Sequence, residues 1–270
     1  MNKYKNIYYT IIFIYCNLVS CNMIDYHPYD VKIDKPFNIN RTNITRIEKK
    51  CASKDTIRFV TMGDSQGFYN ETRDFVNEIN HRNDIDFIIH GGDFTDYGTT
   101  EEFLWQRDIL NRLKIPYVAI IGNHDCLGTG KDAFNTIWGD TNFSFVAGNT
   151  KFVCLNTNAL EYDYSEAIPD FNFIIKEIND STHDIKNTIV CMHARPFCDV
   201  FNNNVAQVFI HYIKQFPNLI FCYNAHGHSY EVTDLYGNGT LFYQSESMVD
   251  RSYLLFTITP NGYEHKICYY

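Results

Sequence analysis

The stretch Tyr117-Val118-Ala119-Ile120-Ile121-Gly122-Asn123-His124-Asp125 joins an apolar run to a polar motif. A short apolar run that contains β-branched residues and ends at a glycine is typical of a buried strand. The polar residues would then form the loop that leaves the strand. Gly-Asn-His-Asp is also the sharpest motif of the chain, since a stated tetrapeptide arises by chance in about one chain in several hundred at average residue usage.

The same arrangement recurs along the chain. Apolar runs at residues 57–62, 87–89, 188–192 and 219–223 precede, in order, Gly63-Asp64-Ser65-Gln66, Gly91-Gly92-Asp93, Met192-His193 and His226-Gly227-His228. The carboxyl ends of parallel strands share one edge of a sheet, so we expect these side chains to converge. Carboxylate, amide and imidazole ligands without thiolate suit hard or borderline divalent cations, and such a cluster needs cations to neutralise it. The pattern therefore predicts a hydrolytic site with two metal ions.

Between and after these runs, periodicity predicts helices and hairpins. Apolar residues at helical spacing predict helices at 72–81, 101–113, 171–178 and 205–216, and a shorter helical pattern at Ile44, Ile47 and Cys51. Paired apolar runs around Gly and Asn predict hairpins at 143–155, 231–243 and 253–269. Strands alternating with helices, followed by hairpins, predict a mixed α/β fold: a four-layer αββα sandwich with two packed mixed sheets flanked by helices.

The first residues form a separate segment. Lys3 and Lys5 precede an apolar stretch, Ile7 to Val19, that is too short to span a bilayer, which predicts a signal peptide at residues 1–20. Leu18-Val19-Ser20-Cys21 resembles a bacterial lipobox, which predicts lipid attachment at Cys21 and an exported protein anchored to the cell envelope. A plain secretory signal with a chance cysteine is the alternative. Residues 21–55 are expected to form a tether and strap, and residues 56–270 the main domain.

Charge and cysteine content restrict the partners. Removing residues 1–20 takes the formal net charge from −9 to −11, which disfavours nucleic acid as a partner because nucleic-acid binding depends on a basic face. Of the 9 cysteines, Cys154, Cys191 and Cys222 lie within apolar runs, where cysteine acts as a small hydrophobic residue. No disulfide is predicted.

Taken in order, the motifs resemble the calcineurin-like metallophosphoesterase superfamily, whose pattern is Asp-x-His, Gly-Asp, Gly-Asn-His-Asp/Glu, His and Gly-His-x-His. The match runs from Asp64 to His228. The resemblance implies the four-layer αββα fold and two divalent ions, of Mn, Fe, Zn or Mg. By resemblance, one ion would be held by Asp64, Asp93 and His228, with Gln66 as a further candidate, and the other by Asp93, Asn123, His193 and His226. Asp93 would bridge the two ions, together with a hydroxide that acts as the nucleophile.

Residues next to these ligands are given other roles. The resemblance implies that His124 stabilises the transition state or protonates the leaving oxygen, and Asp125 is expected to hold its imidazole in place. Arg195, in His193-Ala194-Arg195-Pro196, is a candidate for binding a substrate phosphate, and a salt bridge at the rim is the alternative. His90 is assigned no role.

The sequence also departs from the family pattern. Gln66 stands where most members carry histidine, which puts the occupancy of the first ion in question. Ala225 replaces the glycine that usually leads the last motif. Asp96 stands three residues after Asp93, where the purple acid phosphatase branch has tyrosine, so we discount an iron-tyrosinate centre.

These observations favour a metal-dependent phosphomonoesterase or phosphodiesterase that acts on a small phosphate ester. A degenerate member that serves as a binding module of the cell envelope is the alternative from another class. A nuclease ranks below both, because the acidic balance argues against a basic groove.

Overall fold

The strands form two mixed sheets in a computed structural model that describes residues 5, 7, 9, 27–162, 165–182 and 184–270. The predicted signal peptide and Cys21 lie outside it, apart from positions 5, 7 and 9. The first sheet has the order β11-β10-β1-β2-β3. Its strands are β1 (Ile57–Met62), β2 (Phe87–His90), β3 (Tyr117–Ala119), β10 (Ser252–Thr259) and β11 (Gly262–Tyr269). β1, β2 and β3 run parallel, whereas β10 and β11 are antiparallel additions.

The second sheet has the order β4-β5-β6-β7-β9-β8. Its strands are β4 (Phe143–Ala147), β5 (Thr150–Leu155), β6 (Asn187–Met192), β7 (Leu219–Asn224), β8 (Glu231–Thr233) and β9 (Phe242–Gln244). The four inner strands are parallel, and the edge strands β4 and β8 each pair with a hairpin partner in antiparallel fashion. The three predicted hairpins are thus present, with their first and last residues shifted by no more than one position.

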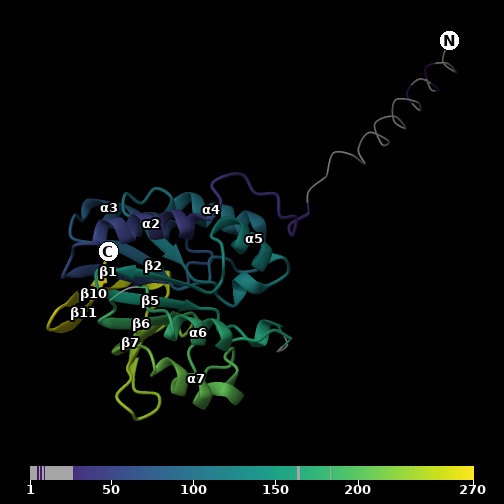
Figure 1. The fold of residues 1–270 in the computed structure, drawn as a ribbon. Helices are drawn as coiled ribbons and strands as arrows, with labels where there is room; N and C mark the ends of the chain where they lie inside the picture. Colours follow the sequence, from purple (N-terminus) through teal and green to yellow (C-terminus); the bar gives the residue numbers. More distant parts are fainter. Residues whose placement is uncertain (1–4, 6, 8, 10–26, 163–164, 183) are drawn as a thin grey trace.

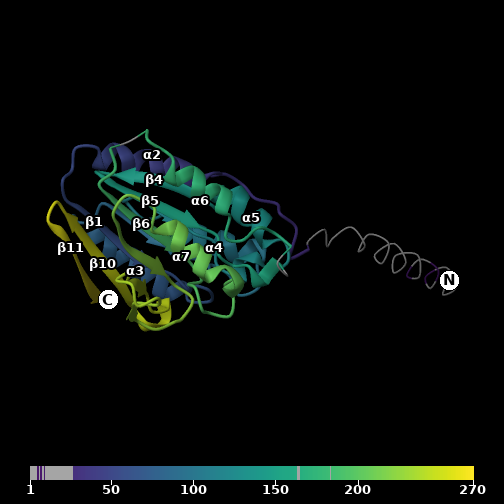
Figure 2. The same cartoon turned by 60° about the horizontal axis from the view of Figure 1, so that its bottom comes forward.

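Helices cover the outer faces of both sheets (Figures 1 and 2). α3 (Tyr69–His81), α4 (Thr100–Leu110) and α5 (Gly130–Ile137) pack on the first sheet, and α6 (Phe171–Ile178) and α7 (Ala206–Ile213) pack on the second. Short 3₁₀ turns occur at His124–Cys126, Leu160–Tyr162, Asn203–Val205 and Met248–Asp250. The predicted α/β sandwich of four layers is confirmed. α5 was not predicted.

Aromatic side chains fill the space between the sheets. Phe59 stacks on Phe87 with ring centroids 5.3 Å apart, and both rings meet the edge of Phe152 from the other sheet, at 5.1 and 5.3 Å. Edge-to-face pairs of this kind add about 0.5–1.5 kcal/mol each beyond the burial of their area. This layer fixes how the two sheets face each other, and therefore how the loops at their ends meet.

The segment before β1 contains α2 (Ile39–Cys51), a longer helix than the sequence pattern predicted. α2 lies against β3 and β4, one edge strand from each sheet. The Asn40 side chain accepts from the Ala119 amide at 2.8 Å and donates to the Ala119 carbonyl at 2.9 Å, and Asn43 donates to the Tyr117 carbonyl at 2.8 Å. The helix thereby supplies the hydrogen bonds that a further strand would give to the free edge of β3.

Among the described residues, no helix is long and apolar enough to cross a membrane. The cysteines of this part of the chain carry free thiols, at positions Cys51, Cys126, Cys154, Cys191, Cys198, Cys222 and Cys268. Cys154, Cys191 and Cys222 are buried within β5, β6 and β7, where they pack as small apolar side chains.

Candidate metal centre

The five predicted motifs lie together at the carboxyl ends of β1, β2, β3, β6 and β7. Their loops are also joined to one another through the backbone: the Asp64 amide donates to the Gly92 carbonyl at 2.9 Å, and the Ala225 amide donates to the His193 carbonyl at 3.1 Å. These two bonds link loops within each sheet, and across the sheets the His226 amide donates to Asp64 Oδ2 at 3.2 Å, so the side chains are held in fixed relative positions. The predicted convergence is therefore present.

Four of the predicted ligands have left-handed backbone conformations. Asp64 has φ 52°, Asp93 59°, His226 70° and His228 52°. Such values are uncommon outside glycine and cost of order 1–3 kcal/mol when the surroundings impose them. Strained residues of this kind cluster at functional sites, so the backbone points to the same residues as the motifs do.

Gly122 allows the loops after β2 and β3 to approach closely. A Cβ atom at this position would overlap the backbone and side chain of Asp93. The Asp125 carboxylate lies behind the same junction, where it accepts from the amides of Asp93, Phe94 and Gly122 at 2.8–2.9 Å. Burial and then the charge of Asp93 raise the pKa of Asp125, while these amide donors oppose the rise. Asp125 thus ties two ligand-bearing loops together.

One group of ligand atoms is formed by Asp93, His193, His226 and Asn123. The atoms of the first three lie within 4.8 Å of one another. The Asn123 Oδ1 atom is 3.0 Å from His193 Nε2 and 3.0 Å from His226 Nδ1, and Asp93 Oδ2 is 3.3 Å from His193 Nε2. Two oxygens and two ring nitrogens at these distances repel each other unless a proton or a cation lies between them.

The hydrogen-bond partner of the His193 ring shows which of its nitrogens carries a proton. His193 Nδ1 lies 2.9 Å from the Gly91 carbonyl, which only accepts, so Nδ1 carries a proton and Nε2 faces the cluster. Burial opposes charge on this ring, but the Asp93 carboxylate outweighs it and raises the pKa of His193 to about 9. An ion that binds Nε2 would displace any proton there, so metal affinity should depend on pH.

A second group consists of Asp64, Asp93 and His228, whose ligand atoms also lie within 4.8 Å of one another. The Asp64 Oδ1 atom is 3.3 Å from His228 Nε2. Asp64 is fully buried, and among the described residues this oxygen has no hydrogen-bond partner. Its charged neighbour is the half-exposed His228 ring, and a cation bound between Asp64 and His228 would satisfy this buried oxygen.

The two groups share Asp93, whose side chain is only 1% exposed. Two cations about 3.5–4 Å apart need a shared anion to reduce their repulsion, and a buried carboxylate common to both groups is suited to that position. The donor set, the buried Asp64 oxygen and the converging atoms around Asn123 therefore fit a pair of divalent ions.

His124 belongs to the centre through its neighbours. Its amide donates to Asp93 Oδ1 at 3.0 Å, and its Nδ1 atom lies 2.9 Å from the Asp96 carbonyl. Burial lowers the pKa of His124, but the Asp96 carbonyl and the Asp93 charge outweigh it, so the net pKa is raised. The expectation that the Asp125 carboxylate holds this ring is not met: the contact is made by the Asp96 backbone.

Gln66 and Arg195, which were also predicted site residues, belong to neither group of ligand atoms. The backbone amide of Gln66 donates to the Asp93 carbonyl at 3.1 Å, while the buried Oε1 atom of its side chain has no hydrogen-bond partner among the described residues. Arg195 donates to Glu231 at 3.2 Å, the rim salt bridge that was the alternative to phosphate binding. Arg195 is therefore neutralised where it stands.

Asp199 and Glu161 belong to the centre but carry no sequence motif. Asp199 Oδ1 lies 3.2 Å from His226 Nε2, and this contact lowers the pKa of Asp199. Glu161 lies within hydrogen-bonding reach of the Asn123 side chain, and burial raises its pKa. Glu161 lies in the loop after β5 and Asp199 in the loop after β6, both several residues beyond the end of the strand, so only three-dimensional proximity reveals them.

His90 is a structural histidine. It stacks on Phe94 with ring centroids 3.8 Å apart, its Nδ1 accepts from the Gly92 amide at 3.1 Å, and its Nε2 lies 2.9 Å from Ser65 Oγ. Both ring nitrogens are thus satisfied without a metal ion.

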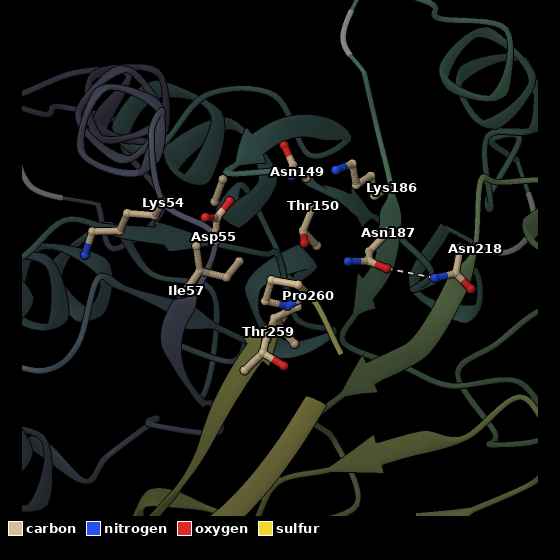
Figure 3. Close-up of a pocket in the computed structure, with 12 residues that line it drawn as sticks. Lys54, Asp55, Ile57, Asn149, Thr150, Lys186, Asn187, Asn218, Thr259 and Pro260 are labelled. Atoms are coloured by element: carbon tan, nitrogen blue, oxygen red, sulfur yellow. Dashed lines mark hydrogen bonds between the residues drawn. The ribbon is translucent and has the colours of Figure 1, made fainter. Parts of the chain in front are cut away.

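A cavity of about 450 Å³ lies at the other end of the sandwich, near the starts of β1, β5 and β6 (Figure 3). Asn218 donates to Asn187 at 2.7 Å, and the amino group of Lys54 is directed away from the cavity toward Asp86 at 2.5 Å. These polar groups are paired with protein partners, and the lining contains none of the groups of metal-ligand atoms found among the described residues.

The chain belongs to the calcineurin-like phosphoesterase family, whose sequence profile matches residues 57–231. The resemblance noted from the motifs is thereby confirmed. No curated protein sequence matches the chain.

Solved structures with low identity share the fold. A dimetal phosphatase from Danio rerio aligns with a TM-score of 0.60 at 11% identity, over 79% of this chain and 99% of its own. GAP50, the anchor in the inner membrane complex of Plasmodium, aligns with 0.58 at 13% identity, over 79% and 84%. A protein from Thermus thermophilus aligns with 0.53 at 12% identity, over 78% and 98%.

Proposed function

We propose that the protein is a metal-dependent hydrolase of small phosphate mono- or diesters. The observation that carries the proposal is the pair of ligand groups that share the buried Asp93. Two divalent ions held there would polarise a phosphoryl group and lower the pKa of a water molecule. The similarity to a dimetal phosphatase supports the same class of reaction.

The protein side chains have separable tasks in this proposal. Asp64, Asp93 and His228 hold one ion, and Asp93, Asn123, His193 and His226 hold the other. His124 lies beside both groups with Nδ1 fixed on the Asp96 carbonyl, so Nε2 is the nitrogen available to donate a proton to the leaving oxygen. The Asp96 carbonyl is one cause of the raised pKa of His124, and this contact does not depend on the charge of Asp93.

The test uses the purified full-length protein, stripped with a chelator and reloaded with Mn²⁺. Hydrolysis of p-nitrophenyl phosphate or of bis(p-nitrophenyl) phosphate is expected once two ions are bound per chain. Asp93→Asn, which weakens the shared anion, is expected to lose both the ions and the activity. Two bound ions without cleavage of either ester would count against the proposal.

Two observations favour a binding module as a second candidate. Gln66 replaces the usual histidine, and Arg195, the predicted phosphate ligand, is engaged by Glu231. GAP50 shows that this fold also occurs in an anchor protein. A stoichiometry of one ion or none per chain, measured by elemental analysis, would favour binding over catalysis. A nuclease remains the lowest candidate because the chain is acidic.

The location of the protein is a separate proposal that rests on the sequence alone. We propose export and lipid attachment at Cys21, which would place the hydrolase on the cell envelope. Metabolic labelling with a radioactive fatty acid is expected to mark the wild-type chain and to leave Cys21→Ser unmarked.

A further inference from the structure

We propose that Asp199 is a positioning residue that holds the His226 ring in the orientation needed to bind a metal ion through Nδ1. The inference rests on the proposed metal centre and adds a residue that the motifs do not contain. His226 presents Nδ1 to Asn123 Oδ1 at 3.0 Å and Nε2 to Asp199 Oδ1 at 3.2 Å. The ring thus lies between the ligand cluster and the carboxylate.

The contact selects one tautomer of His226. Both ring nitrogens face oxygen acceptors, and the charged Asp199 carboxylate is a stronger acceptor than the neutral Asn123 amide oxygen, so a neutral ring carries its proton on Nε2 and leaves Nδ1 for an ion. A metal-binding histidine usually donates its other N–H group to a carboxylate or a carbonyl, which fixes both tautomer and orientation. His193 meets the same requirement with the opposite nitrogens, since its Nδ1 faces the Gly91 carbonyl.

The loop that carries Asp199 is held in place from both sides. Asn203 accepts from the Phe197 amide at 2.8 Å and donates to the Cys198 carbonyl at 2.7 Å. Phe197 has a left-handed backbone with φ 70°, an unfavourable conformation for a bulky residue that the surrounding contacts maintain. The Val200 amide donates to Asp199 Oδ1 at 3.1 Å. Asp199 is therefore fixed before an ion binds, although its side chain is 81% exposed.

The high exposure of the Asp199 side chain limits how much its substitution should weaken metal binding. Exposed ion pairs contribute little to stability, so Asp199 is not needed for folding. Loss of a residue that orients a metal ligand costs about 10- to 100-fold in metal affinity, and solvent around Asp199 places the expected loss near 10-fold. Only the site that contains His226 should be affected.

The first experiment titrates Mn²⁺ into the chelator-stripped full-length chain by calorimetry and counts the bound ions by elemental analysis. We expect Asp199→Ala to weaken one of two binding steps about 10-fold. Asp199→Asn retains an oxygen acceptor and should lose less, while Asn203→Ala should shift the same step by releasing the loop. Glu264→Ala removes an exposed carboxylate from β11 and serves as the matched control.

The second experiment reads the tautomer itself by ¹⁵N NMR of histidine-labelled, metal-free protein, with His226 assigned from its loss in His226→Ala. We expect the Nε2–H form in the wild type and a mixture in Asp199→Ala. Unchanged Mn²⁺ affinity together with an unchanged tautomer in Asp199→Ala would overturn the proposal. So would a third ion that is lost in both Cys198→Ser and Asp199→Ala, because Asp199 would then be a ligand of a rim site formed with Cys198 and His226.

Failure of the proposed function gives a different result. If the wild type binds two Mn²⁺ ions and cleaves no ester, the proposed hydrolase function is wrong. The Mn²⁺ affinity of Asp199→Ala and the tautomer of His226 still test the role of Asp199 in that case. If the wild type binds no ion, both proposals fall.

Discussion

At the scale of single residues, His124 and Asp93 are neighbours with different tasks. Asp93 contributes to both ligand groups, whereas the His124 ring is absent from both groups and is fixed instead on the Asp96 carbonyl. Ion binding and proton donation should therefore be separable by substitution.

His124→Ala is expected to lower turnover about 10²- to 10⁴-fold, the usual contribution of a general acid. The number of bound Mn²⁺ ions should stay at the wild-type value, because the ring lies outside the ligand groups. Steady-state kinetics with elemental analysis of the same sample tests both statements. Loss of an ion in His124→Ala would show that the ring is a ligand.

His90 should control part of the pH dependence of stability. Burial lowers its pKa to about 3, against 6.5 for an unperturbed imidazole. Because the folded value is the lower one, the stabilising contribution is complete above pH 6.5 and is lost as the pH falls toward 3. As the pH falls from 6.5 toward 3, protonation of this residue in the unfolded chain should lower the free energy of unfolding by up to about 1.4 kcal/mol per pH unit.

Urea denaturation of the chelator-treated protein at a series of pH values tests this expectation. His90→Gln should show a shallower pH dependence than the wild type, whatever its absolute stability. His211→Gln, on the exposed side of α7, is the matched control. Equal slopes for the wild type and His90→Gln would contradict the assignment.

At the scale of elements, the helical pattern of α2 was predictable from the sequence, whereas its hydrogen bonds to β3 were not. The apolar positions Ile44, Ile47 and Cys51 predicted a short helical pattern, and the helix extends back to Ile39. Asn40 and Asn43 looked like ordinary polar residues in a turn-rich segment. Their pairing with β3 depends on a strand far along the chain, as Asn40 and Ala119 are separated by 79 positions.

Asn40→Ala is expected to cost about 1–3 kcal/mol, because it leaves a buried amide and carbonyl at Ala119 without partners. Arg41→Ala changes an exposed neighbour on the same helix and should have little effect. Urea denaturation of the two variants measures the difference. A loss no larger in Asn40→Ala than in Arg41→Ala would mean that the edge of β3 finds other donors and acceptors.

The ligand motifs were predictable for a related reason. Asp64, Asp93, Asn123 and His193 each follow a strand directly, so local sequence already fixes the edge at which they emerge. Asp199 and Glu161 reach the same place from long loops, and no local pattern specifies where a loop returns. The prediction that the Asp125 carboxylate holds the His124 ring failed for a third reason. Its hydrogen-bond donors are backbone amides from two loops, and how those loops approach each other cannot be read from local sequence.

At the scale of the whole molecule, the aromatic layer between the sheets holds the two halves of the site together. Asp64, Asp93 and Asn123 come from the first sheet, and His193, His226 and His228 from the second. A change in the spacing of the sheets would therefore move the two sets of ligands relative to each other.

Phe87→Ala should destabilise the protein by about 3–5 kcal/mol, since the ring is fully buried between Phe59, Phe145 and Phe152. We also expect weaker Mn²⁺ binding, because the cavity loosens the contact between the sheets. Guanidinium denaturation and calorimetry measure the two effects. Tyr269→Ala, at a residue that is 67% exposed, is the control, and an equal loss in both variants would exclude a special role for the layer.

The left-handed backbone of Asp64, Asp93, His226 and His228 has a consequence for how the family can diverge. Aspartate, asparagine, histidine and glycine are the residues that tolerate this conformation best, and the first three are also good metal ligands. A descendant that exchanged one of these ligands for asparagine or glycine would weaken its hold on the ions without adding strain to the loops. Inactive scaffolds can therefore arise from this architecture in single steps, without passing through a misfolded intermediate.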